Sequence, residues 1–280
     1  MITEPAPAKL NLALHVRRRR PDRYHELETI FAFCRDGDLI ELEPATDNAF
    51  AIAGPFAAAL TGSAPAEPWA DNLVTRAADA FTAEYRVDRA HRIALTKNLP
   101  IASGIGGGSA DAAATLRALA RLHRVPLDDP GLMAIAVGLG ADVPACLRGA
   151  TTIGRGRGDA LEPVAGLPGM PVLLVNPGVP VSTGAVFARW DGVDRGPIGK
   201  GDLLTRARAG RNDLQAAARG LAPAIDAVLD LLTSAPGALL ARMSGSGATC
   251  FALFDDRAAC AVTAAAARAR GWWCLETALA

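Results

Sequence analysis

The sequence predicts a fold of mixed α and β structure, built in two parts. Residues 7–16 alternate between apolar and polar side chains, which is typical of a half-buried strand. Residues 91–97 form another strand, which leads through a glycine loop into an alanine-rich helix at 110–123. In the second half, strand and helix patterns follow one another, and the glycine-rich stretch 151–158 indicates a domain boundary.

The other elements follow from periodicity and from residues that cap helices. In the first half, we expect strands at 24–33, 38–43 and 49–52, a surface loop or frayed helix at 57–68, and helices at 73–85 and 130–138, capped by Asp71-Asn72 and Asp129. In the second half, we expect strands at 171–175, 238–242, 249–254 and 272–276, and helices at 182–190, 214–220, 223–232 and 257–270. The strand at 272–276 is expected at a sheet edge. The polar stretch 191–212 is expected to be a mobile excursion, and the sequence leaves open whether it covers a site.

Composition and charge restrict the class of partner. Half of the 280 residues are hydrophobic, and 29 basic residues balance 29 acidic ones, so no broad surface for nucleic acid or membranes is predicted. No segment approaches the ~18 apolar residues of a membrane span, and the start of the chain has no apolar signal-peptide core. Five scattered cysteines without a Cys-x-x-Cys pair favour reduced thiols and no zinc site. We therefore expect a cytoplasmic protein, a monomer or weak homodimer, whose partners are small molecules.

The glycine loop ahead of the alanine-rich helix is the strongest functional signal. Gly104, Gly106, Gly107 and Gly108 fall within five positions at the start of that helix. Free amide groups and the positive end of the helix dipole bind anions, and a nucleotide phosphate is the expected occupant. No lysine follows the last glycine, which excludes a P-loop, and Ser109 stands where the dinucleotide fingerprint needs its last glycine. A flexible loop without a ligand is the alternative.

Two further segments carry conspicuous polar groups. Lys9 and Asn11 share the polar face of the first strand, and because asparagine is disfavoured in strands, we interpret them as part of a polar site. A solvated face is the alternative. Asp142 stands between an apolar helix and Val143-Pro144, a pair that favours extended backbone. A catalytic carboxylate and a cap or turn residue are the two interpretations of Asp142.

These signals together resemble the GHMP kinase superfamily over essentially the whole chain. The segments that carry the resemblance are 7–12, 24–27, 71–73, 99–109, 140–144, 212–214 and 242–248. The resemblance implies an α+β fold of two domains. Residues 1–155 would form an N-terminal ATP-binding α/β domain like one found in a ribosomal protein, and 156–280 a ferredoxin-like C-terminal domain, with the active-site cleft between them.

The resemblance also implies an activity. Within the superfamily, the pattern is similar to kinases that phosphorylate the 2-hydroxyl of the methylerythritol part of a cytidine diphosphate ester, in the non-mevalonate route to isoprenoid precursors. The cofactors would be ATP and Mg²⁺. Asp142 would accept the proton of the hydroxyl, and Lys9 would stabilise that carboxylate as the anion and orient the hydroxyl.

Binding residues are carried over from the same motifs. The ATP site would comprise Asn72, Lys97, Pro100, Ile101, Ala102, Ser103, Gly104, Ile105, Gly106, Gly107, Gly108 and Ser109, with the Ser109 hydroxyl as a candidate Mg²⁺ ligand. The substrate site would comprise Asn11, Tyr24, His25, Thr183, Phe187, Gly245, Ser246 and Gly247. Tyr24 and Phe187 would stack on the two faces of the cytosine, and His25 would hydrogen-bond it. Ordinary helix packing is the alternative for Phe187.

The sequence departs from the superfamily pattern at three places. Ala110 stands where a second serine is usual, and Ser103 stands where glycine is frequent. Neither change removes a backbone amide, so the phosphate site is expected to survive. Arg155 and Arg157 would face either a substrate diphosphate or solvent. The rival functions are another small-alcohol kinase of the superfamily, of the homoserine or mevalonate type, and a non-catalytic nucleotide-binding module.

Overall fold

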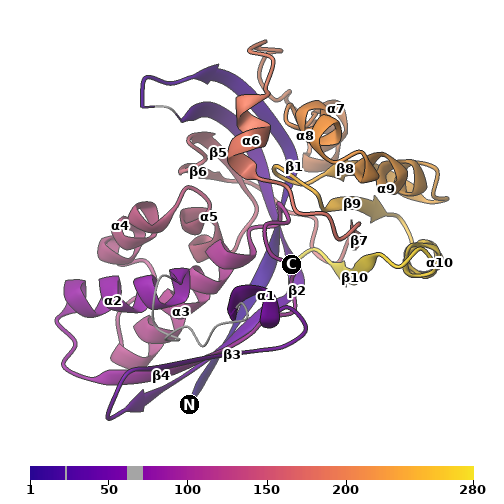
Figure 1. The fold of residues 1–280 in the computed structure, drawn as a ribbon. Coiled ribbons are helices and arrows are strands. Elements are labelled where there is room, and N and C mark those ends of the chain that lie inside the picture. The colour runs from indigo at the N-terminus through magenta and orange to yellow at the C-terminus, as the bar shows by residue number, and fades with distance from the viewer. Residues whose placement is uncertain (23, 62–71) are drawn as a thin grey trace. The chain divides into compact units, whose positions relative to one another are not determined.

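The computed structural model describes residues 1–22, 24–61 and 72–280, which form two compact units (Figure 1). Unit 1 comprises Met1–Ala8, Asp36–Ile101 and Gly106–Gly149, and unit 2 comprises Lys9–Arg35, Ala102–Ile105 and Ala150–Ala280. Neither unit is one continuous stretch of chain, because strands β1 (Ile2–Arg19) and β2 (His25–Ala45) are long and each contributes residues to both units. The division into domains at 1–155 and 156–280 remains a prediction.

Strand β2 is one element where the sequence predicts two, at 24–33 and 38–43. The residues between them, including Gly37, continue the strand. A Cβ on Gly37 would lie 2.1 Å from the carbonyl oxygen of Ala6 on the neighbouring strand β1. Glycine at this position therefore permits the close approach of β1 and does not mark a turn.

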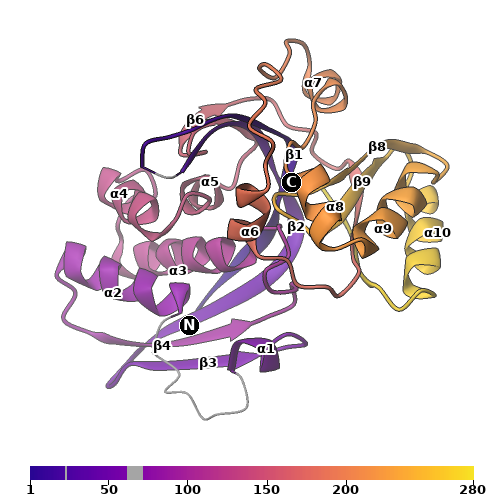
Figure 2. The ribbon, with the colours of Figure 1, turned by 45° about the horizontal axis from the view of Figure 1, so that its top comes forward.

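Unit 1 is a small sheet with helices on one side. Residues 39–45 of β2 pair antiparallel with β4 (Ala90–Thr96), and β3 (Ala49–Ala53) pairs with β4 in parallel. The helices are α1 (Ala58–Thr61), α2 (Leu73–Tyr85), α3 (Gly107–His123), α4 (Pro130–Leu139) and α5 (Val143–Arg148). Figures 1 and 2 show α2 to α5 gathered on one side of β3 and β4. Phe81 of α2, Leu116 of α3 and Ile93 of β4 are fully buried in this unit.

Two expectations for unit 1 change. Val143-Pro144 does not enter an extended segment, because both residues lie in the first turn of α5, where proline needs no amide partner. The stretch expected as a loop or frayed helix begins with the short helix α1, and its residues 62–68, like the expected cap residue 71, lie outside the described residues. Asn72 caps α2 as expected, since its side-chain oxygen accepts a hydrogen bond from the amide of Val74 at 2.9 Å.

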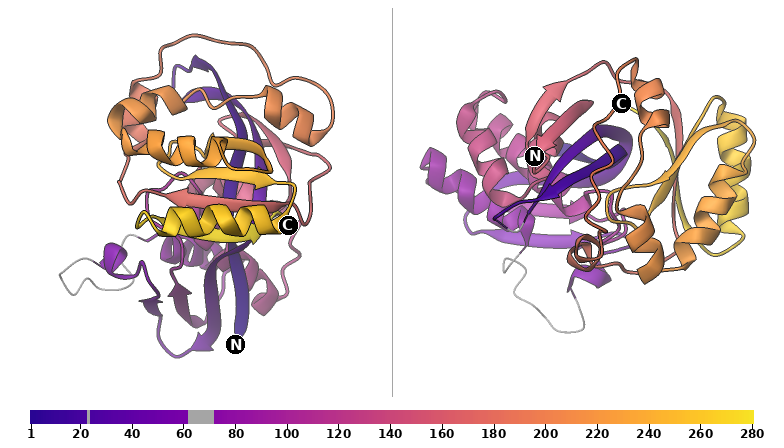
Figure 3. Two further views of the ribbon diagram at one scale, coloured as in Figure 1. Left: turned by 90° about the vertical axis from the view of Figure 1, so that its right-hand side faces the viewer. Right: turned by 90° about the horizontal axis from the view of Figure 1, so that it is seen from above.

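The C-terminal part of unit 2 has the ferredoxin-like topology that the resemblance implies. Its sheet contains β7 (Pro171–Asn176), β8 (Ala238–Met243), β9 (Cys250–Phe254) and β10 (Trp273–Ala278), all antiparallel, in the order β10-β7-β9-β8. Helices connect β7 to β8 and β9 to β10, which gives the β-α-β-β-α-β arrangement. Figure 3 shows α9 (Ala224–Thr233) and α10 (Arg257–Arg268) along one face of this sheet, and β10 lies at its edge as predicted.

Unit 2 also contains elements that the sequence does not predict. Strand β5 (Thr152–Gly156) pairs with residues 27–31 of β2 and forms a hairpin with β6 (Ala160–Pro163), where the sequence suggests only a glycine-rich boundary. The other helices are α6 (Thr183–Ala188), α7 (Leu203–Ala209) and α8 (Gln215–Leu221), and α7 lies within the expected excursion at 191–212. All five cysteines are free thiols. No helix among the described residues has the length and apolarity needed to span a bilayer.

Candidate active site

The start of α3 presents the anion-binding groups expected of the glycine loop. Gly106 is the N-cap residue with φ +67°, a conformation that favours glycine, and its carbonyl accepts the hydrogen bond of the Ala110 amide at 2.8 Å. The amides of Gly107, Gly108 and Ser109 precede the first intrahelical bond, and none of these residues is buried. The helix start therefore offers accessible donors and a positive dipole end to an anion.

Gly104 is required for a different reason, which lies in the packing of two loops within unit 2. A Cβ on Gly104 would lie 2.3 Å from the carbonyl oxygen of Ser244 and 2.7 Å from the amide nitrogen of Gly247. A Cβ on Gly245 would in turn lie 2.6 Å from the carbonyl oxygen of Gly104. The early and late glycine loops therefore interlock, and Gly104 and Gly245 allow this contact.

The remaining residues of the early loop hold it in place. The carbonyl of Ser103 accepts a hydrogen bond from the amide of Thr249 at 3.1 Å, and the carbonyl of Ile105 accepts one from the amide of Lys9 at 2.9 Å. Ala102 is exposed and has φ +49°. Pro100 and Ile101 precede it as the last residues of that segment of unit 1.

Lys97 lies in a buried cluster of charges in unit 1. Its ammonium, 3% exposed at the side chain, is 2.5 Å from Asp38 Oδ2 and 2.7 Å from Asp111 Oδ2. The other oxygen of Asp38 accepts the amides of Asn98 and Leu99, at 2.6 and 2.8 Å. The cluster thus ties β2 and the chain between β4 and the glycine loop to α3, at a residue just beyond the first turn of that helix.

In both Lys97 and Asp111, burial and the oppositely charged neighbour shift the pKa in opposite directions. Burial lowers the pKa of Lys97, but the carboxyl groups of Asp111 and Asp38 raise it by more, so the pKa lies above its ordinary value. Burial raises the pKa of Asp111 to about 8, against the opposing effect of Lys97. The expected places of Lys97 and Asn72 in the ATP site remain predictions. The Lys97 ammonium already has two carboxyl partners, and Asn72 already caps α2.

Lys9 and Asn11 lie together in unit 2, as the alternation of β1 predicts. The Lys9 ammonium donates to Asn11 Oδ1 at 2.9 Å and lies 5.4 Å from the ring centre of Phe31. The amide nitrogen of the Asn11 side chain donates to the Thr29 hydroxyl at 2.8 Å, and that hydroxyl donates to the carbonyl of Ala13 at 2.7 Å. Lys9, Asn11 and Thr29 are all at most 2% exposed, so the side chains form an ordered polar array on β1 and β2.

The late glycine loop is bonded to the same array. The Ser244 hydroxyl accepts the backbone amide of Asn11 at 3.2 Å and donates to the carbonyl of Gly104 at 3.0 Å. The side-chain amide of Asn212 donates to the carbonyls of Met243 and Gly245, both at 2.8 Å. The segment around Asn212 therefore fixes the loop whose backbone is expected to bind substrate.

Two predicted substrate residues meet on this loop. Thr183 stands at the first position of α6, and its hydroxyl lies 2.9 Å from the Ser246 hydroxyl, either of which can donate. The adjoining Gly247 has φ +84°, and its Cβ position would lie 2.7 Å from the Met243 sulfur. Glycine at 247 is thus set by the local backbone as well as by any ligand.

Aromatic residues gather around His25 at the start of β2. The imidazole lies 4.8 Å from the Phe187 ring, tilted by 30°, and 5.7 Å from the Trp190 ring at an edge-on angle of 88°. Burial, followed by the charge of Arg19, lowers the pKa of His25 below its ordinary value. The imidazole is therefore neutral at pH 7, and it can accept or donate a hydrogen bond.

Tyr24 contacts one of the two arginines of the β5–β6 hairpin, Arg157. The Tyr24 side chain is exposed, and the Arg157 guanidinium lies 4.8 Å from the centre of its ring. Arg155 is 2.6 Å from Glu162 and 3.6 Å from Glu28. Arg157, whose guanidinium also lies 3.3 Å from Asp159, thus borders the expected cytosine site, and Arg155 is paired with two carboxylates. The stacking of Tyr24 and Phe187 on the two faces of a base remains a prediction.

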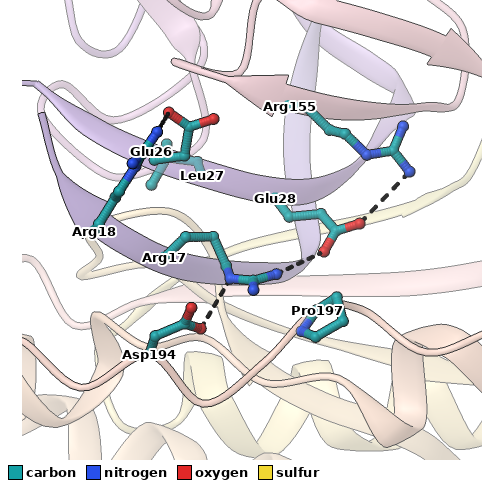
Figure 4. Close-up of a pocket in the computed structure, with 8 residues that line it drawn as sticks. All are labelled: Arg17, Arg18, Glu26, Leu27, Glu28, Arg155, Asp194 and Pro197. Atoms are coloured by element: carbon teal, nitrogen blue, oxygen red, sulfur yellow. Dashed lines mark hydrogen bonds and ion pairs between the residues drawn. The ribbon is translucent and has the colours of Figure 1, made fainter.

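Unit 2 also has a pocket of about 420 Å³ whose charged walls neutralise one another (Figure 4). It is lined by Arg17, Arg18, Glu26, Leu27, Glu28, Arg155, Asp194 and Pro197. Arg17 lies 3.7 Å from Glu28 and 2.8 Å from Asp194, and Glu28 also accepts the amide of Ile198 at 2.8 Å. None of the predicted site residues lines this pocket, and its ion pairs hold residues 194–198 against β1 and β2.

Asp142 is the N-cap residue of α5 in unit 1, with φ −87° and ψ −17°. Its side chain makes no capping hydrogen bond to that helix. The capping interpretation that the sequence leaves open is therefore not supported, and the role of a reacting carboxylate remains a prediction.

Sequence reasoning misses several residues that the structure brings into these clusters. They are Thr29, Asp38, Asp111, Trp190 and Ser244. Thr29 alone has a usable signal, because it lies four positions after His25 on the same strand and hence on the same face. The partners of Asp38 and Asp111 come from distant segments, which periodicity does not connect.

Two family models match the chain. The model described as "GHMP kinases N terminal domain" matches residues 72–150, and the one described as "GHMP kinases C terminal" matches residues 198–271. The matches fall on either side of residue 155. A homoserine kinase from Cytophaga hutchinsonii, 20% identical, shares the fold with a TM-score of 0.69, over 99% of this chain and 95% of that one. Fold and family models together define the class, that of the GHMP kinases.

Relatives named "4-diphosphocytidyl-2-C-methyl-D-erythritol kinase" match along nearly their whole length. The one from Rhizorhabdus wittichii is 56% identical over 99% of this chain and 94% of the relative, and the one from Sphingopyxis alaskensis is 52% identical over 97% and 96%. A crystal structure of 4-(cytidine 5'-diphospho)-2C-methyl-D-erythritol kinase superposes with a TM-score of 0.81 at 34% identity, over 99% of both chains. The chain belongs to the family of these kinases.

Proposed function

We propose that this chain transfers the γ-phosphoryl group of ATP to the 2-hydroxyl of 4-diphosphocytidyl-2-C-methyl-D-erythritol, in the non-mevalonate route to isoprenoid precursors. The observation that carries the proposal is the 56% identity to a relative named for this kinase, over 99% of the chain. The reduced thiols fit a cytoplasmic enzyme. Small molecules are its proposed partners.

The start of α3 is the proposed seat of the ATP phosphates. Its accessible amides, at Gly107, Gly108 and Ser109, supply hydrogen bonds to phosphate oxygens without the desolvation of a side-chain charge. The Ser109 hydroxyl lies in the same first turn, so it fits a Mg²⁺ ion, which keeps most of its ligands from water and phosphate. Bound there, Mg²⁺ would neutralise developing charge on the phosphate oxygens.

Asp142 and Lys9 are the proposed catalytic pair. An alcohol is a weak nucleophile, so the Asp142 carboxylate accepts its proton as the new O–P bond forms. The Lys9 ammonium stabilises negative charge and orients the hydroxyl, and Asn11 accepts one of the hydrogen bonds of that ammonium. Most of the rate acceleration comes from this positioning, since the transition state of phosphoryl transfer is loose.

The acceptor's cytidine end is assigned to the aromatic cluster around His25. Tyr24 and Phe187 provide stacking surfaces, and neutral His25 provides hydrogen bonds that distinguish cytosine from other bases. Thr183, Ser246 and the backbone of Gly245 and Gly247 bind the remainder of the substrate. Homoserine and mevalonate have no base, so this cluster favours the cytidine ester over the other alcohols of the superfamily.

The test is a comparison of acceptors with the purified protein. With ATP and Mg²⁺, 4-diphosphocytidyl-2-C-methyl-D-erythritol should yield ADP and a phosphorylated ester, whereas homoserine and mevalonate should not. ADP formation with another alcohol and none with the cytidine ester would overturn the assignment.

The matched variant is Asp142→Asn. Loss of the proton acceptor should abolish turnover while ATP still binds, as measured by equilibrium titration with a non-hydrolysable analogue. Full turnover by this variant would remove Asp142 from the mechanism, and an inactive wild-type protein that binds ATP would support the non-catalytic alternative.

A further inference from the structure

Thr29 occupies a position in unit 2 from which it determines the direction of a neighbouring side-chain amide. It lies on β2, is 1% exposed, and its hydroxyl contacts two groups of β1: the side chain of Asn11 and the carbonyl of Ala13. No motif of the superfamily resemblance assigns it a function. Its bonds nevertheless connect to Lys9, to which the proposed function gives a catalytic role.

Only one assignment of donors and acceptors is consistent with the contacts among Lys9, Asn11, Thr29 and the carbonyl of Ala13. A hydroxyl has a single proton to donate, and Thr29 donates it to the carbonyl of Ala13 at 2.7 Å, since a carbonyl can only accept. The same hydroxyl must then accept from Asn11, so the –NH₂ group of Asn11 faces Thr29, at 2.8 Å. The carboxamide oxygen of Asn11 is consequently turned toward Lys9, at 2.9 Å.

An ammonium group requires this orientation. Lys9 has three N–H donors and no acceptor, so an amide turned the other way would bring two donors face to face in a buried place. The side chain of Asn11 is too nearly symmetric in shape for packing alone to choose between its two orientations. The hydroxyl of Thr29 accepts from the –NH₂ group and so holds the Asn11 carboxamide in the orientation that Lys9 requires.

We propose that Thr29 is a positioning residue for phosphoryl transfer, which fixes the carboxamide of Asn11 and through it the direction of the Lys9 ammonium. Thr29 itself touches neither substrate nor the reacting atoms. This inference rests on the proposed function, because it concerns the orientation of a lysine assigned to that reaction.

The substitution Thr29→Val tests the proposal, because valine keeps the β-branched shape and removes the hydroxyl. We expect kcat to fall about 10- to 100-fold, the loss typical when a group that orients a functional side chain is removed. The KM for ATP should not change. Thr29→Ser, which restores the hydroxyl, should return most of kcat. A kcat of Thr29→Val equal to that of the wild type would overturn the proposal.

Thr152 provides the matched control. It lies on the neighbouring strand β5, is fully buried, and its hydroxyl has no hydrogen-bond partner among the described residues. Thr152→Val makes the same chemical change in the same sheet, and kcat should stay at the wild-type value. An equal loss of kcat in both valine variants would mean that any buried change in this sheet lowers activity, and it would overturn the specific role of Thr29.

A double-mutant cycle with Asn11→Ala separates positioning from general damage. Because Thr29 acts through Asn11, Thr29→Val should have no further effect on kcat in the Asn11→Ala background. Additive losses would contradict the proposal. If Thr29→Val fails to fold, Thr29→Ala takes its place in the same cycle. A wild-type protein without kinase activity would refute the proposed function itself, an outcome distinct from any result with Thr29.

Discussion

Lys9 and Lys97 are equally buried, yet the groups that orient them differ in kind. Both are 2% exposed. In unit 1, Lys97 lies between two carboxyl groups, those of Asp38 and Asp111. In unit 2, Lys9 donates to the carboxamide of Asn11, whose direction is set by Thr29. The carboxyl groups of Asp38 and Asp111 bring charge to their contacts with Lys97, whereas the carboxamide of Asn11 gives Lys9 an uncharged acceptor of fixed direction.

The comparison teaches which lysine serves the fold and which is suited to chemistry. The Lys97 cluster joins the chain that follows β4 to Asp111 near the start of α3, so its charges stabilise the neighbourhood of the proposed phosphate site. The hydrogen bonds from Lys9 to Asn11 and from Asn11 to Thr29 hold one N–H of the Lys9 ammonium in a fixed direction. The third lysine of the chain, Lys200, is exposed and serves as a reference for both.

The largest expected effect is on stability, with Lys97→Met. Removing this ammonium leaves the buried carboxyl groups of Asp38 and Asp111 without their cation, which typically costs about 3–5 kcal/mol of unfolding free energy. Urea denaturation followed by circular dichroism measures the loss. Lys200→Met, as the control, should change stability by less than ~0.5 kcal/mol. A Lys97 variant as stable as this control would contradict the structural role of the cluster.

The next effect is on activity, with Lys9→Met. Methionine keeps an unbranched side chain and removes only the ammonium group, so the variant should fold, but kcat should fall by about 10²–10³-fold, as for the loss of one preorganised donor. Steady-state kinetics with saturating ATP measures the change, and thermal melting verifies folding. Should Lys9→Met retain wild-type kcat, the division of labour between the two lysines would be wrong.

Asp111→Asn should change how stability depends on pH, which sharpens the account of the Lys97 cluster. Burial raises the pKa of Asp111 to about 8, so the folded protein holds this proton more tightly than the unfolded chain does. The unfolding free energy should therefore fall as pH rises from about 4 to 8, with a slope of at most about 1.4 kcal/mol per pH unit from this group. Asparagine keeps an acceptor for Lys97 and has no such proton.

Urea denaturation of both proteins between pH 5 and pH 8 tests this expectation. The stability of Asp111→Asn relative to the wild type should rise with pH, because contributions from all other groups are common to both. A difference that does not vary with pH would show that Asp111 titrates alike in the folded and unfolded states.

Local sequence signals predict much of the fold. Helix α2 matches its predicted bounds at 73–85, because an asparagine cap and a regular apolar face both mark it. Strands whose pairing depends on distant segments are harder to predict from sequence. Strands β5 and β6 consist largely of glycine, arginine and small residues. They form because residues 27–31 of β2 offer an edge to β5, with which β6 then pairs. Proline at 144 misleads because it permits the first turn of a helix as readily as extended structure.

The candidate site is predicted where neighbours in sequence are neighbours in space. Lys9 and Asn11 are two positions apart on one strand face, and their contact follows from alternation. The sequence identifies the glycines of the early loop, but it does not show why each is needed. Gly104, for example, is required by its packing against the late loop. The Lys97 cluster depends on a strand, a loop and a helix from three parts of the chain, so periodicity has no access to it.

The scarcity of lysine has a practical consequence for chemical labelling. With Lys9 and Lys97 both buried, an amine-reactive reagent applied to the folded protein has one accessible side chain, Lys200, besides the terminal amine. Lys97 can be acylated only when unit 1 opens and exposes its ammonium. Lys9 can be acylated only when unit 2 opens in the same way. Mass spectrometry after brief acylation would therefore report the opening of unit 1 at Lys97 and of unit 2 at Lys9, with the exposed Lys200 as the internal standard.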